Sequence, residues 1–161
     1  MELVELQGTE QRHFAEAHKS YDWARRLLAR THDSAHLEAQ LALAWAMALF
    51  ESGKAKQSLA ALQRAHQVLQ HVEPSPLWVR TKASLFSRLG TVYYQLGLES
   101  LEEQRRALHA KATECFEENI RLLQDAFGPD APTLERARSN LAGMLIAVSY
   151  THLTRPTSGL E

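Results

Sequence analysis

The sequence contains few residues that would break or cross-link the chain. Its 161 residues include one cysteine, Cys115, with seven glycines and five prolines. A single cysteine forms no disulfide within the chain, and this cysteine usage is typical of a reducing compartment, so we expect a cytoplasmic protein. The chain is long enough to bury a sizeable core without covalent help.

An excess of one charge and a long hydrophobic run are also lacking. Eighteen Lys and Arg oppose nineteen Asp and Glu, for a formal net charge of −1. No strong field therefore attracts nucleic acid or an acidic membrane. The longest apolar run, residues 41–50, is shorter than the ~18 residues of a membrane span, and the N-terminus does not resemble a signal peptide. We expect neither nucleic acid nor membrane as a partner.

Long stretches rich in Ala, Leu, Glu, Gln and Arg lie between the glycines and prolines. These residues favour helix, and apolar residues recur at i, i+3, i+4 and i+7, with no alternation of period two. The pattern predicts an all-α fold of six helices, at about 9–30, 36–51, 55–71, 76–96, 100–126 and 133–148. Short connections predict that sequential helices pack as antiparallel neighbours.

Local signals mark several helix ends. Gly53 and Gly97 stand where a glycine would terminate a helix. The Ser-Pro pair at 75–76 supplies an N-cap followed by a proline at the first helical position. Ser100 and Glu103 have the spacing of a capping box, in which each side chain accepts from the other residue's backbone N–H.

An internal repeat relates the helices. Residues 86–97 align without gaps with residues 42–53, and both place a small residue, Gly90 or Ala46, between bulky ones. A small residue there lets a partner helix approach closely. Residues 139–145 are a third copy. A small–large–small stripe occurs in three other helices, at Ser58, Leu62 and Ala65, at Ala112, Phe116 and Asn119, and at Ala17, Tyr21 and Ala24.

These residues resemble tetratricopeptide repeats, most closely the long-hairpin type of kinesin light chains and many bacterial regulatory proteins. The resemblance rests on the stripes, on the turn at 127–133 and on the following Asn140-Leu141-Ala142. It implies a right-handed α-α superhelix, a solenoid of about two and a half antiparallel hairpins in residues 1–148, incomplete at both ends. Residues 149–161 are rich in turn formers, and we expect an irregular tail that is not native to the protein.

One departure from the repeat lies in residues 99–108. Gly90 and Ala142 are 52 positions apart, whereas Ala46 and Gly90 are 44 apart. The surplus predicts a second helix lengthened by about 10 residues, or roughly 15 Å. This extension is either a private contact surface or a charged, solvated overhang.

Motifs for chemistry are weak throughout the chain. Ser-Gly-Lys at 52–54 is not a phosphate loop, because Ala48 stands where the leading glycine is required. Cys115 lies among glutamates, which disfavour a thiolate, and we expect it to be packed. The segment 32–38 holds two histidines, Asp33 and Glu38, and is either a metal site or a helix cap at Asp33 or Ser34. We predict no enzyme activity, no cofactor and no metal.

The resemblance implies binding of another protein or peptide along the concave face. Met47 and Phe50 either line this groove or pack against the neighbouring repeat. We expect a scaffold or interaction module of a larger bacterial regulatory protein; the alternatives are a free-standing adaptor or co-chaperone, and a regulatory domain of an enzyme whose catalytic part lies elsewhere. Exposed terminal faces predict self-association. The candidate groove residues are Gln40, Met47, Phe50, Glu51, Ser87, Arg88, Thr91, Tyr94, Gln95, Arg136, Ser139 and Asn140.

Overall fold

The computed structural model describes residues 2–30 and 34–153, and no strand occurs among them. The prediction of an all-α fold is confirmed. The six helices are α1 (Glu2–Leu28), α2 (Ala35–Glu51), α3 (Ala55–Leu69), α4 (Pro76–Leu98), α5 (Glu102–Phe127) and α6 (Pro132–Leu153).

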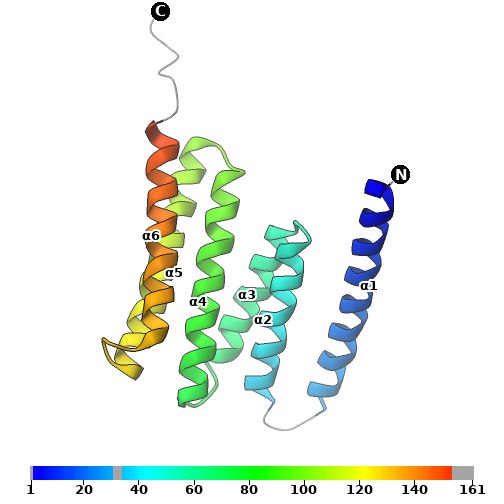
Figure 1. The fold of residues 1–161 in the computed structure, drawn as a ribbon. Helices are drawn as coiled ribbons and strands as arrows, with labels where there is room; N and C mark the ends of the chain where they lie inside the picture. Colours follow the sequence, from blue (N-terminus) through cyan, green and yellow to red (C-terminus); the bar gives the residue numbers. More distant parts are fainter. Residues whose placement is uncertain (1, 31–33, 154–161) are drawn as a thin grey trace, which may run out of the picture.

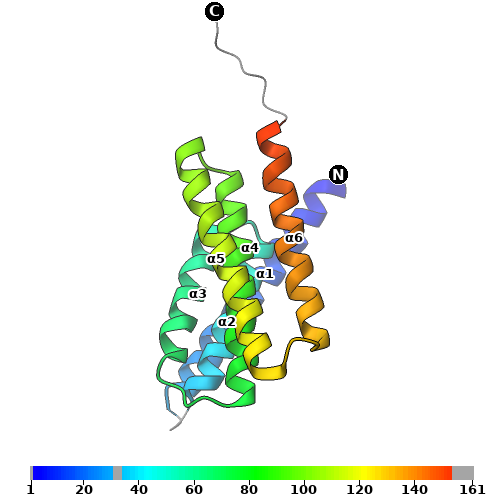
Figure 2. The ribbon, with the colours of Figure 1, turned by 90° about the vertical axis from the view of Figure 1, so that its left-hand side faces the viewer.

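The helices stand side by side in two layers. Helices α6, α4, α2 and α1 follow one another in a row, with α5 and α3 behind them (Figure 1). Turned by a right angle, α3 and α5 lie on one side and α6 on the other, with α2 and α4 between them (Figure 2). The closest pairs are α2 with α3 and α4 with α5, while α1 packs on α2, α3 on α4 and α5 on α6. Helices adjacent in sequence are thus neighbours in space, as the short connections predict.

Small residues allow the two closest pairs to pack. A Cβ atom added at Gly90 of α4 would lie 2.9 Å from ring carbons of Phe116 in α5. In the other pair, Ala46 is fully buried and its carbonyl accepts a hydrogen bond of 2.7 Å from the Ser58 hydroxyl of α3. The predicted close approach at both small residues is therefore confirmed.

The core follows the stripes read from the sequence. A large cluster joins α2, α3, α4 and α5, and includes Leu62 and Leu85. Two smaller clusters lie between α4, α5 and α6: one is built around Leu134, the other around Phe116 and Met144. The core is therefore spread over three clusters from α2 to α6 rather than concentrated at one centre.

Two helices extend several residues beyond the predicted bounds. Helix α1 begins at Glu2, seven residues before the predicted start at about 9, because Gly8 is tolerated within the helix. Helix α6 continues to Leu153, five residues beyond 148, into the segment predicted to be irregular. No proline stands between Pro132 and Pro156, so nothing ends α6 earlier. Residues 154–161 of the predicted tail lie outside the described residues.

Two of the predicted helix ends are confirmed in detail. Ser75 caps α4 by accepting a hydrogen bond of 3.1 Å from the backbone N–H of Trp78. Gly53 has a φ of 73°, the left-handed value that glycine adopts without strain. The N–H of Gly53 donates to Phe50 and that of Lys54 to Leu49, the bonding pattern of a Schellman C-cap.

Two other predictions of helix ends are wrong. Ser100 does not cap α5; its hydroxyl donates to the carbonyl of Leu96 at the end of α4, at 2.7 Å, and Leu101 occupies the N-cap position. Gly97 lies inside α4, which continues to Leu98. The requirement for glycine at 97 comes instead from the ring of His109 in α5, which a Cβ at this position would hit.

The predicted lengthening of the second hairpin is confirmed. Helix α5 has 26 residues and its counterpart α3 has 15. Arg105 holds the added turns against α4, since its guanidinium donates to the carbonyls of Gly97 and Ser100 at 3.2 and 3.0 Å. Leu101 at the tip is 82% exposed.

Candidate peptide-binding groove

Two adjoining hollows mark the face of α2, α4 and α6. The first, ≈ 250 Å³, lies between α2 and α4, with Met47 and Phe50 on one wall and Arg88 on the other. The second, ≈ 540 Å³, lies between α4, α5 and α6 and includes Arg136. Ser84 and Ser87 make the hollows continuous, because both residues line each hollow. We call the pair the α2–α4–α6 groove.

Helix α4 forms the floor of this groove because of its sequence spacing. Arg80, Ser84, Ser87, Arg88 and Thr91 line the two hollows. They are spaced at i, i+4, i+7, i+8 and i+11, which places them on one helix face. The opposite face of α4 carries core residues, so this polar stripe lies at the surface of the protein.

Seven of the twelve predicted residues line the groove. They are Met47, Phe50, Ser87, Arg88, Thr91, Arg136 and Asn140. Phe50 satisfies both interpretations of its role, since it lines the groove and also packs against the large core cluster. The five that line neither hollow are Gln40, Glu51, Tyr94, Gln95 and Ser139.

Tyr94 departs most from its predicted place. Its ring stacks on that of His109 in α5, with centroids 5.2 Å apart, and it packs against the cluster of Phe116 and Met144. Tyr94 therefore holds α4, α5 and α6 together. Gln95 is also engaged on its own helix, where its amide donates to Glu99 at 2.9 Å.

Several lining residues are absent from the prediction, and two of them, Arg80 and Asn119, bear on binding. Arg80 shares the α4 stripe with Ser84 and Arg88, so its spacing was a usable signal. Asn119 belongs to the small–large–small stripe of α5, where the corresponding position in α3 holds Ala65. The usable signal was a polar asparagine at a stripe position that in α3 holds an alanine packed against the neighbouring helix.

The groove carries positive charge without an acidic counterpart among its lining residues. Arg80, Arg88 and Arg136 line it, and no Asp or Glu does so among the described residues. The Arg88 guanidinium is half-buried and donates from Nε to the hydroxyl of Ser84 at 3.3 Å. Burial lowers the pKa of Arg88, and the nearby carboxylate of Glu51 acts in the opposite direction. A partly desolvated cation gains more from an arriving carboxylate than one in open water.

Asn119 adds an unused acceptor. Its side chain is 4% exposed and lines the second hollow. No described residue donates a hydrogen bond to its buried Oδ1. A buried carbonyl oxygen without a donor costs free energy, so a ligand N–H placed there would relieve that cost.

Cys115 and the histidines form no metal-binding group within the described residues. Cys115 is packed, as predicted, and burial, followed by the charges of Glu114 and Glu118, raises the pKa of its thiol to about 11. No group of three His, Cys, Asp or Glu within the described residues is arranged to hold a metal. The 32–38 cluster falls partly outside these residues; His36 within it lies 3.3 Å from the Thr81 hydroxyl.

The comparisons with known proteins return no relative. No family model, no curated protein and no solved structure matches the chain. Within the described residues, no helix has the length and apolar character that crossing a membrane requires. The geometry of the groove is therefore the basis of the function proposed below.

Proposed function

We propose that this chain is a tetratricopeptide-type interaction module whose hairpins wind into a right-handed superhelix. The support is the repetition of one packing unit. The α2–α3 pair meets at Ala46 and the α4–α5 pair meets at Gly90, the equivalent small residue of each first helix. In both pairs the partner belongs to the small–large–small stripe of the second helix, Ser58 in α3 and Phe116 in α5. Equivalent small residues in consecutive hairpins produce equivalent helix crossings, which is how solenoid repeats stack.

The observation that carries the function is the composition of the α2–α4–α6 groove. Among the residues that the structure describes, three arginines and no carboxylate line a hollow surface whose apolar wall is Met47 and Phe50. Its complement is a peptide segment with acidic side chains beside an aliphatic or aromatic one. A charge-assisted hydrogen bond to the half-buried Arg88 contributes about 1.5–3 kcal/mol. Pairs with the exposed Arg80 and Arg136 are screened by solvent and contribute about 0–1 kcal/mol each.

Asn119 gives the groove a means to hold the peptide backbone. Its Oδ1 is a buried acceptor that can take a backbone N–H, while its neighbour Arg136 takes a carboxylate. Backbone contacts supply affinity and side-chain pockets supply specificity. We assign the chain the role of a scaffold or interaction module in the cytoplasm, as part of a larger regulatory protein whose partner is another protein.

Selection from a random peptide library displayed on phage tests this function and requires no candidate partner. We expect the selected peptides to be enriched in Asp or Glu next to Leu, Ile or Phe. The selection is then repeated with Arg88→Glu, which reverses the charge in the groove. This variant should lose the acidic preference, and wild-type binders should weaken by at least about tenfold.

Arg138→Glu is the matched control, because Arg138 is exposed on α6 and lines neither hollow. It makes the same change in net charge, so it should keep the wild-type peptides at nearly wild-type affinity. Equal losses in both variants would indicate a general charge effect and would contradict the groove assignment. Enrichment of basic peptides by the wild type would contradict it as well.

A further inference from the structure

Three helices of this chain carry a small–large–small stripe. Two of these stripes are covered by a neighbouring helix, and the third is open. In α3, Ser58, Leu62 and Ala65 are no more than 1% exposed, because α2 covers them. In α5, the corresponding stripe around Phe116 is no more than 4% exposed under α4. The third stripe, on α1, contains Tyr21.

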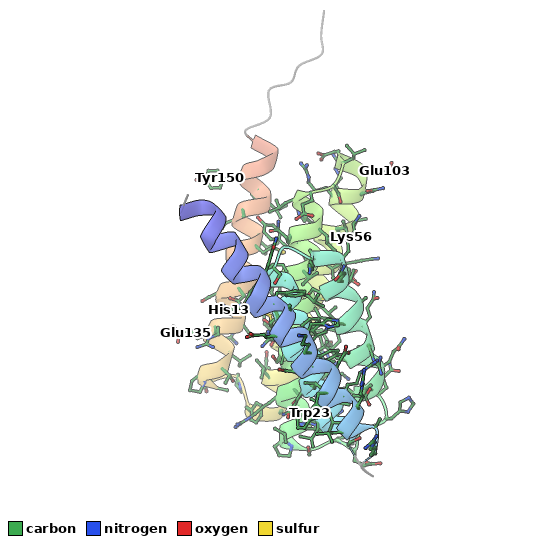
Figure 3. The ribbon with its side chains drawn as sticks, turned by 90° about the vertical axis from the view of Figure 1, so that its right-hand side faces the viewer. His13, Trp23, Lys56, Glu103, Glu135 and Tyr150 are labelled. Carbon is green, nitrogen blue, oxygen red and sulfur yellow. The ribbon has the colours of Figure 1, made fainter. Side chains whose placement is uncertain are left out.

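The α1 stripe lines an open apolar groove. Ala17, Tyr21 and Ala24 are only partly buried and line a hollow of ≈ 710 Å³. Its other wall is α2, where the Trp45 ring stacks on Tyr21 with centroids 4.9 Å apart. Trp23, at the rim of this hollow, is 66% exposed and is labelled near the lower end of α1 in Figure 3. We call this hollow the α1–α2 groove.

Helix α6 exposes the surface that would fill such a groove. Its Ala142 corresponds to Gly90 of α4, the residue that meets Phe116. Gly90 is buried, whereas Ala142 is exposed and Leu145, one turn further, is 45% exposed. The other side of α6 is already used, since Leu134 and Met144 belong to the core clusters.

We propose that α6 of one copy of this chain docks in the α1–α2 groove of a second copy. Ala142 then packs on the α1 stripe of the second copy at Tyr21 as Ala46 packs on the α3 stripe, and Leu145 meets Ala17. The two surfaces lie at opposite ends of the helix row (Figure 1). The contact is therefore head-to-tail and leaves one free surface at each end, so that further copies can add.

Complementary size favours this occupant over a symmetric contact between two α6 helices. Two α6 helices would set Ala142 and Gly143 of one copy against the same small residues of the other. That arrangement sets no bulky side chain opposite the small residues, unlike the contact between Gly90 and Phe116. The ring of Tyr21 provides the bulk that Ala142 lacks. The proposal uses a different surface from the α2–α4–α6 groove, and it succeeds or fails independently of it.

Sedimentation and light scattering of the full chain over a wide concentration range provide the first test. We expect the mass to rise above 18.2 kDa with concentration. Ala24→Glu places a charge in the α1–α2 groove and Ala142→Glu places one on α6. Each variant alone should be monomeric, because each has lost one of the two surfaces.

Mixing distinguishes head-to-tail docking from every symmetric contact. An equimolar mixture of the two variants retains one intact pair of surfaces and should form a 1:1 dimer that does not grow further. Ala110→Glu, an exposed alanine on α5, is the matched control and should associate like the wild type. An Ala24→Glu variant that still dimerises by itself would overturn the proposal, as would a wild type that stays monomeric at high concentration.

Disulfide trapping keeps the proposal testable if a glutamate variant unfolds. Ala17→Cys and Leu145→Cys are prepared separately, each with Cys115→Ala, and then mixed under mild oxidation. A mixed dimer should form in preference to either homodimer. A predominance of Leu145→Cys homodimers would establish the symmetric α6 contact instead and exclude the head-to-tail arrangement.

Discussion

The ring of Phe116 occupies the space that a side chain at Gly90 would need. A Cβ built on Gly90 would lie 2.9 Å from Cε2 and Cζ of Phe116. That is well inside the ≈ 3.5–4.0 Å of a favourable carbon–carbon contact. Phe116 is itself 4% exposed and lies in a cluster with Ala112 and Met144, so its ring is not free to move away. The α4–α5 hairpin therefore depends on this pair.

Gly90→Ala should destabilise the fold although alanine is the better helix former. The gain in helix propensity is about 1 kcal/mol. Overpacking against Phe116 costs about 1–3 kcal/mol, so we expect a net loss of about 1 kcal/mol in the free energy of unfolding. Chemical denaturation followed by circular dichroism measures it.

Gly143→Ala is the matched control for that prediction. Gly143 lies in α6, and a Cβ there would meet no atom within 4 Å. Helix propensity then acts alone and should stabilise the protein by about 0.5–1 kcal/mol. The measurement is made at low concentration, where association through α6 does not contribute. Stabilisation by both substitutions would contradict the close contact at Gly90.

Ser75→Ala should destabilise the protein, whereas Glu103→Ala should have little effect. The Ser75 hydroxyl accepts from Trp78 and caps α4, and loss of such a cap costs about 1 kcal/mol. Glu103 is exposed, and Ser100, its partner in the predicted capping box, bonds instead to Leu96. The free energy of unfolding of each variant shows whether Ser75 caps α4 and whether Glu103 takes part in a capping box at α5. A loss of about 1 kcal/mol for Glu103→Ala would indicate instead that the predicted capping box does form at the start of α5.

Cys115 should resist alkylation in the folded protein. At pH 8 a thiol with a pKa of about 11 is ionised in about one molecule in a thousand, and the thiolate is the reactive form. The rate of modification by iodoacetamide, measured with and without denaturant, checks this. A variant with Cys115→Ala and Ser52→Cys is the control, since Ser52 is exposed and its thiol should react quickly in the folded state. Equal rates at both positions would contradict the packed thiol.

His66 should make stability fall below neutral pH. Burial lowers its pKa from the ordinary value, and the charge of Lys82 lowers it further. The unfolded chain therefore binds a proton before the folded protein does. The stability present above the ordinary pKa of ~6.5 is lost as the pH falls through the lower folded value.

His66→Gln should remove that part of the pH dependence. Unfolding measured between pH 7.5 and pH 5 should show a shallower decline for the variant than for the wild type. His71→Gln, which removes an exposed histidine near the end of the same hairpin, is the control and should follow the wild type. An identical slope for all three proteins would contradict the assignment to His66.

Local sequence determined which segments are helical and where several of them end. Helix propensity and apolar spacing act within a few turns, so the six helices were predicted independently of the helices that pack against them. The same holds for the ends at Gly53 and Ser75, where the residues that form the cap are adjacent in sequence. The small–large stripes also identified Gly90 and Ala46 as points of close approach, because close packing of helices requires a small residue opposite a large one.

Only the tertiary structure decided how the remaining side chains are used. Tyr94 and Arg88 lie on the same helix, and spacing alone did not show that Tyr94 turns to His109 while Arg88 stays in the groove. Asn119 became a groove residue because the packing of α4, α5 and α6 leaves the second hollow beside its buried side chain. The rotation of each helix about its axis, and its crossing angle, depend on contacts between residues distant in sequence. Local periodicity does not specify these quantities, and they decide which surfaces remain open.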